Sequence, residues 1–171
     1  MASSPPQLLQ AEGLHAALSS EFIDLQVFSD LLGCDDSVER DFTREVVDGF
    51  IRQSNLNILN MRGFYSQLAS RTGPATPQDL ARLYELAHFF RSSSSCVGAY
   101  HVSATCQSLQ SLASLQSPVD VQQLAGTFAE QLTLLAGQVR QASEHLAAVY
   151  GLPPSVLDAV PSADAAESAY M

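Results

Sequence analysis

The sequence predicts an all-α protein, an antiparallel four-helix bundle with one or two additional helices at its N-terminal end. Apolar residues recur at spacings of three and four through most of the chain, and no segment reads as a series of alternating strands. The 171 residues, 46% of them hydrophobic, are enough for one domain with a substantial core. We expect an N-terminal arm over 1–19 with a short helix, the bundle over 20–150 and a mobile tail over 151–171.

Local signals define the first four helices. The arm helix is expected to be short, because glycine interrupts its amphipathic pattern. The next helix is expected to follow a cap at Ser19 or Ser20 and to end at Gly33. A long third helix is predicted from a cap at Asp36 or Ser37 to about residue 70. The fourth begins at Thr76-Pro77, where a capping hydroxyl precedes proline at the first helical position.

The remaining helices are predicted from breakers and apolar seams. The serine run at 92–95 and Gly98 are expected to end the fourth helix. The sixth helix is expected to start at Ser117-Pro118 and to stop at Gly151. The seams are Val102, Cys106, Leu109 and Leu112 in the fifth helix, and Ala125, Phe128, Leu132, Leu135, Val139, Ala142, Leu146 and Val149 in the sixth.

The charge of the chain excludes several classes of partner. The formal net charge is −10, which disfavours nucleic acid and anionic membranes.

The expected location is intracellular. No apolar run approaches the roughly 20 residues needed to span a bilayer, and the N-terminus lacks the features of a signal peptide. Cys34, Cys96 and Cys106 form no close pair, which suits a reducing compartment, and each is interpreted as a small buried hydrophobe.

His88 is the candidate functional residue. It lies on one helix face with Tyr84, Arg91, Ser92 and Ser95, offset from the apolar stripe, and is expected to face water or a partner. An imidazole nitrogen can accept a phosphoryl group, a guanidinium can balance its charge, and small residues leave room for a partner. The chain has no lysine and no phosphate-binding loop, so we expect no nucleotide site and no cofactor of its own.

The stretch from Leu86 to Ala99, LAHFFRSSSSCVGA, resembles the phosphoacceptor motif of histidine-containing phosphotransfer proteins, particularly plant ones. Phe89 is closer to the fungal form of the motif. The resemblance is ungapped from His88 to Ala99 and covers roughly residues 20–150. It implies a phosphorelay intermediate in which His88 accepts a phosphoryl group from the receiver domain of a hybrid histidine kinase and passes it to a response-regulator aspartate. Mg²⁺ would then belong to the receiver, and the plant likeness implies cytokinin-linked signalling in cytoplasm and nucleus.

The chain departs from the family motif at two positions near the histidine. Arg91 stands where the family usually has lysine, and a planar guanidinium is expected to stabilise charge there. Ser92 stands where the family has glycine, so its hydroxyl either bonds the imidazole or phosphate or crowds the incoming aspartate. On the next helix, Gln107 or Gln110 is placed to hydrogen-bond the ring. Gln110 matches a fungal glutamine, and a solvated side chain is the equal alternative.

A partner-binding surface and two rival functions complete the predictions. Tyr84 and Ser95 share the histidine face, while Phe22, Ile23 and Phe28 are apolar candidates for docking, although most of that set is expected in the core. One rival is a receiver-domain binder, impaired in phosphotransfer, that dampens the relay. The other is a di-iron carboxylate bundle, because two segments have the Glu-x-x-His spacing of such sites. The residues concerned are Glu12, His15, Glu45, Glu85, His88 and Glu130.

Overall fold

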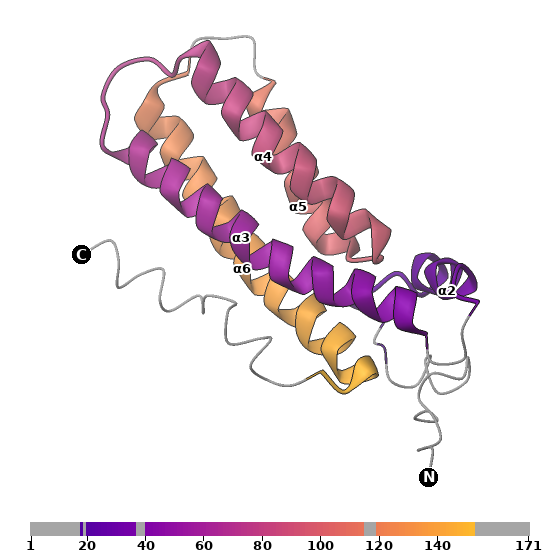
Figure 1. The fold of residues 1–171 in the computed structure, drawn as a ribbon. Coiled ribbons are helices and arrows are strands. Elements are labelled where there is room, and N and C mark those ends of the chain that lie inside the picture. The colour runs from indigo at the N-terminus through magenta and orange to yellow at the C-terminus, as the bar shows by residue number, and fades with distance from the viewer. Residues whose placement is uncertain (1–17, 19, 37–39, 115–118, 153–171) are drawn as a thin grey trace.

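The protein is an all-α bundle. The computed structural model describes residues 18, 20–36, 40–114 and 119–152 (Figure 1). The helices in these ranges are α2 (Leu25–Gly33), α3 (Asp41–Ala69), α4 (Pro77–Cys96), α5 (Tyr100–Ala113) and α6 (Val121–Tyr150), which confirms the predicted fold class. None of these helices has the length and apolar character needed to cross a bilayer. The predicted arm helix and the tail beyond residue 152 lie outside the described residues.

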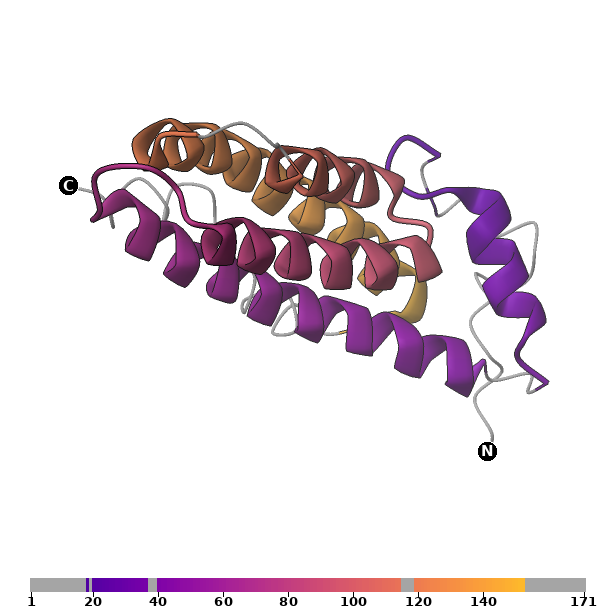
Figure 2. The ribbon, with the colours of Figure 1, turned by 90° about the horizontal axis from the view of Figure 1, so that it is seen from above.

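Helices α3 to α6 form the bundle, and α2 lies across one end of it. The pairs α3–α4, α4–α5, α5–α6 and α3–α6 are all in contact, which closes a four-membered ring of antiparallel neighbours. Figure 2 shows α2 turned across the end where α3 begins and α4 finishes. Every position of the predicted α6 seam is buried in the core between the helices. The long α3 stays one continuous helix despite the polar residues at its centre.

The starts of α2, α3 and α6 differ from the sequence predictions. Asp24 caps α2, because its carboxylate accepts from the backbone N–H groups of Gln26 and Val27. The helix therefore begins several residues after Ser20. The N-cap position of α3 is Arg40, not the predicted Asp36, and Asp35 accepts the Thr43 N–H at 2.9 Å from outside the helix. Ser37, the other predicted cap, lies outside the described residues. Asp120 caps α6, later than the predicted Ser117-Pro118, which is also outside those ranges.

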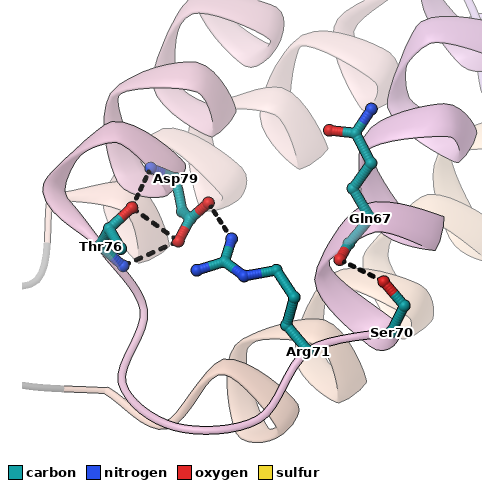
Figure 3. A network of polar contacts seen from close by, with 5 residues as sticks. All are labelled: Gln67, Ser70, Arg71, Thr76 and Asp79. Atoms are coloured by element: carbon teal, nitrogen blue, oxygen red, sulfur yellow. Dashed lines mark hydrogen bonds and ion pairs between the residues drawn. The ribbon is translucent and has the colours of Figure 1, made fainter.

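The beginning of α4 confirms the predicted Thr76-Pro77 start. The Thr76 hydroxyl accepts the Asp79 N–H, and the Asp79 carboxylate accepts the Thr76 N–H, forming a capping box. Figure 3 shows Arg71 reaching across the loop to the same carboxylate, with Nη1–Oδ1 at 2.7 Å. Burial raises the pKa of Asp79, but hydrogen bonds from Arg71 and Thr76 and the positive charge of Arg71 outweigh it and leave that pKa lowered.

The serine run does not end α4, contrary to the prediction. The Ser94 hydroxyl donates to the Phe90 carbonyl one turn earlier at 2.9 Å, and the Ser93 hydroxyl donates to the same carbonyl at 3.0 Å. These bonds satisfy the hydroxyls inside the helix, so the serines do not compete with the helical backbone. The helix continues to Cys96 and ends before Gly98, which has φ +74°.

Gly98 lies where the α4–α5 turn meets the segment before α2. Its carbonyl accepts the Asp24 N–H at 2.8 Å, and the Tyr100 hydroxyl donates to the carbonyls of Ser20 and Glu21. A Cβ atom at residue 98 would lie 2.7 Å from the Asp24 carbonyl oxygen. Both the close approach of the two backbones and the positive φ therefore require glycine.

Substituting Gly98→Ala should lower the free energy of unfolding by about 2–3 kcal/mol, from backbone strain and displacement of the Asp24 backbone. Urea denaturation followed by circular dichroism would measure it. Gly126→Ala is the matched control, because Gly126 is exposed in α6 and an added Cβ meets no atom within 4 Å. In the control variant, the free energy of unfolding should rise by up to about 1 kcal/mol. Equal midpoints for the two variants would contradict this account of the turn.

Substituting Asp79→Asn should lower the free energy of unfolding at neutral pH by about 1 kcal/mol, because the charged acceptor is lost. The pKa of Asp79 is lowered in the folded state, so its contribution is complete above the ordinary aspartate pKa of about 4 and is lost as the pH falls through the folded pKa. The difference between wild type and variant should therefore shrink on acidification. Asp48→Asn, at an exposed pair with Arg52, should have little effect at either pH.

Candidate functional site

His88 lies on the exposed face of α4, as the spacing predicts. Leu83, Ala87 and Phe90 on the opposite face are fully buried, whereas His88 is exposed. The Tyr84 ring, one turn earlier, stacks on the imidazole with ring centroids 5.9 Å apart and planes 8° apart. The helix thus holds the imidazole at the surface and restrains its orientation from one side.

Gln110 of α5 lies directly beside the imidazole. Its Nε2 is 3.2 Å from His88 Nδ1, and its Oε1 accepts a hydrogen bond from Arg91 Nη1 at 3.1 Å. The Gln110 side chain is buried, with 7% exposure, whereas Gln107 is exposed. The two candidates that the sequence left open are therefore distinguished by the packing of α5 on α4. His88 Nε2 has no hydrogen-bond partner within the described part of the chain.

Arg91 is half-buried and directs its guanidinium at the Gln110 amide. Within the ranges that the structure describes, no carboxylate lies within ion-pair distance of it. An arginine one turn from a surface histidine and paired with a neutral amide keeps its charge available for an incoming anion.

The serines near His88 hydrogen-bond to the protein itself. The Ser92 hydroxyl donates to the His88 backbone carbonyl at 3.1 Å, so it points away from the imidazole ring. The Ser95 hydroxyl is 2.9 Å from that of Ser103 on α5, and both side chains remain accessible at the turn end of the hairpin. The Ser92 hydroxyl therefore does not form the hydrogen bond to the imidazole that the sequence analysis considered.

The apolar residues before and within α2 do not form a surface around the histidine. Ile23 and Phe28 are fully buried, so neither can contact a partner, and the prediction for Ile23 is wrong. Phe22 is half-buried, with its ring centroid 4.6 Å from that of His145 in α6. Its segment is joined to the Gly98 turn, more than two helical turns along α4 from His88.

One exposed aromatic residue beside the site was not among the predicted docking residues. Phe89, next to His88 in the sequence, is 59% exposed. Phe89 falls outside the spacing of the buried stripe, which is the sequence signal that could have identified it. Together with Tyr84, it adds exposed aromatic surface to α4 next to His88.

Within the described residues, the carboxylates do not form the arrangement that a di-iron centre requires. Glu45, Glu85 and Glu130 are all exposed, whereas a di-iron bundle needs carboxylates that project into its interior. The described ranges contain no group of three or more His, Cys, Asp or Glu side chains suited to a metal ion. Glu12 and His15 lie outside those ranges.

The cysteines differ from the expectation that all three are buried. Cys34 caps the end of α2 and Cys96 is the last residue of α4, and both are exposed. Cys106 is buried under the site in α5. Burial raises the pKa of its thiol to about 12, although the nearby charge of Arg91 acts in the opposite direction.

An antiparallel helical bundle that presents a histidine on the exposed face in the middle of one helix is the arrangement expected of a histidine phosphotransfer protein. The family model of the Hpt domain matches residues 45–147, more than half of the chain, and the chain belongs to this family. The match includes α4, α5 and nearly all of α6, and therefore the whole His88 site.

The chain is also similar to a curated fungal protein. It is 28% identical over 104 residues to "Multistep phosphorelay regulator 1" of Schizosaccharomyces pombe (strain 972 / ATCC 24843). The aligned part is 61% of this chain and 32% of the fungal protein, so the match spans about a third of that relative's length. Family and relative together support a histidine phosphotransfer role in two-component signalling.

Cys34 and Cys96 should react readily with a thiol reagent such as Ellman's reagent, and Cys106 should not react until the protein unfolds. The buried thiol is both inaccessible and held protonated, while the other two are exposed. The measurement is the number of thiols labelled before and after addition of denaturant. A Cys106→Ala variant should show the same native labelling as wild type and lose only the slow thiol. Three fast-reacting thiols in the native protein would contradict the burial of Cys106.

Proposed function

We propose that this protein is a phosphorelay intermediate in which His88 carries the phosphoryl group. It accepts the group from the aspartyl phosphate of a receiver domain in a hybrid histidine kinase and passes it to the receiver aspartate of a response regulator. One observation carries the assignment: His88 is exposed in the middle of α4, with Nδ1 beside a buried amide and Nε2 open to a partner.

The other described histidines lack these features. His145 lies against Phe22, with its Nδ1 2.8 Å from the Gln141 carbonyl oxygen. His101 is exposed beside Tyr100, but no buried amide is bonded to its ring. Neither has a basic residue one turn later on the same helix face, so neither matches the requirements of a phosphoryl acceptor as His88 does.

The transfer step needs positioning and charge stabilisation more than acid–base chemistry. The Nε2 lone pair attacks phosphorus, the bond from phosphorus to the aspartyl oxygen breaks, and its electron pair returns to the partner's carboxylate. The ring takes up positive charge, which the attached phosphoryl group offsets. Mg²⁺ and the aspartate belong to the receiver domain, while Arg91 supplies a second cation from this chain.

The surface around His88 suits a macromolecular partner. Tyr84 and Phe89 expose aromatic surface beside the imidazole, and Ser92 and Ser95 are small enough to let a second backbone approach closely. An acidic chain of net charge −10 is suited to a protein partner rather than to nucleic acid or an anionic membrane. The motif resemblance supports placing the protein in a plant-type, cytokinin-linked relay of cytoplasm and nucleus.

A phosphotransfer assay tests the proposal. The protein is mixed with a hybrid-kinase receiver domain carrying labelled aspartyl phosphate, and wild type should acquire an acid-labile label within minutes. His88→Gln should acquire none while retaining its helical circular dichroism spectrum, because the exposed side chain contributes little to the core. His101→Gln is the matched control and should be labelled like wild type.

The other outcomes are equally specific. Receiver binding without any label on wild type would favour the alternative function, a binder that dampens the relay. Label that persists in the His88→Gln variant would place the acceptor at another residue.

A further inference from the structure

The Gln110 amide lies between two groups whose hydrogen-bonding capacities differ. A guanidinium has donors and no acceptor, so the amide atom 3.1 Å from Arg91 has to be the carbonyl oxygen. The amide NH₂ group then faces His88 Nδ1 at 3.2 Å. Because NH₂ is only a donor, Nδ1 has to accept, and the single proton of the neutral imidazole resides on Nε2.

This tautomer cannot attack phosphorus from Nε2, since that nitrogen holds a proton instead of a free lone pair. The resting site therefore differs from the reactive one in the position of one proton. A rotation that exchanges the oxygen and NH₂ positions of the Gln110 amide, called inversion below, would favour the other tautomer. The amide oxygen would then accept from Nδ1–H, and the Nε2 lone pair would be free. As long as Arg91 remains bonded to the amide, inversion would place donor against donor.

We propose that Arg91 is a positioning residue that holds His88 in its unreactive tautomer through Gln110 and releases it when a phosphoryl anion arrives. This inference rests on the proposed phosphotransfer function and adds a control step to it. A guanidinium forms stronger hydrogen bonds with a doubly charged phosphoryl group than with a neutral amide. Arg91 has no competing carboxylate among the described residues, so the incoming anion is its preferred partner.

The proton balance follows from the exposure of the ring. On departure of Arg91, the amide inverts, Nδ1 takes a proton from water, and Nε2 releases its own proton to water. Nε2 then attacks phosphorus, and the electron pair of the broken bond returns to the partner's aspartate. The Nδ1 proton stays hydrogen-bonded to the Gln110 carbonyl oxygen, which stabilises the positive charge on the phosphorylated ring.

The test is the tautomer of each histidine, read by ¹⁵N NMR of imidazole-labelled protein at about pH 9, where an imidazole is neutral. His88 should be Nε2–H in the wild type, with its signals assigned from the His88→Gln variant. His145 is an internal reference for the opposite form, because its Nδ1 faces the Gln141 carbonyl and has to carry the proton. Finding His88 in the Nδ1–H form would overturn the proposal.

Three variants distinguish control of the His88 tautomer by Arg91, which we call the gate, from a purely structural role of Arg91. Arg91→Ala should show a measurable Nδ1–H population at His88, and Arg91→Lys should restore the wild-type form because it keeps a donor for the amide oxygen. Gln110→Glu should convert His88 to Nδ1–H, since a carboxylate only accepts. If the His88 tautomer in the Arg91→Ala variant were indistinguishable from that in wild type, the proposed role of Arg91 would be wrong.

Adding a receiver domain activated with beryllofluoride, an aspartyl-phosphate analogue, should shift wild-type His88 to the Nδ1–H form. A bound receiver that leaves the ring unchanged would overturn the release step.

The two proposals fail in different ways. The expected tautomers without any phosphotransfer would contradict the carrier function, whereas normal phosphotransfer with His88 in the Nδ1–H form at rest would contradict the gate.

Discussion

The turn between α4 and α5 is the constraint on which the site depends. The chain reverses over Val97, Gly98 and Ala99, with the Ala99 N–H bonded to the Ser94 carbonyl at 2.9 Å. This tight reversal lays α5 antiparallel on α4, so that Gln110 meets a histidine 22 positions earlier. The same turn bonds to Asp24 and thereby holds α2 across the end of the bundle. A looser connection would leave both the amide and the N-terminal segment without their partners.

The distribution of charge explains how an acidic protein can present a cation at its site. Arg52, Arg82 and Arg140 pair with carboxylates about one turn away in their own helices, and Arg71, in the loop after α3, pairs with Asp79 in α4. Arg91 instead bonds a neutral amide that is itself buried. Its charge is therefore less compensated than that of the paired arginines, and an arriving anion meets a cation already positioned next to the acceptor ring.

The bundle also has polar interior positions that the site does not use. Ser54 and Asn55 in the middle of α3 are buried, and their side-chain polar atoms have no hydrogen-bond partner among the described residues. Buried groups of this kind lower stability. The extensive apolar seam of α6 offsets that cost, which is consistent with α3 remaining continuous through this region.

The sequence by itself determined the features that depend on neighbours along the chain. These are the helical class, the Thr76-Pro77 start of α4, the buried α6 seam and the outward face of His88, because capping and three-and-four spacing act within one helix. The Asp24 cap and the continuation of α4 through its serines are also local, because their hydrogen bonds reach groups only two to four residues away. The tertiary structure alone selected Gln110 over Gln107 and buried Ile23. Both outcomes depend on where a distant segment packs, and no local pattern encodes that geometry.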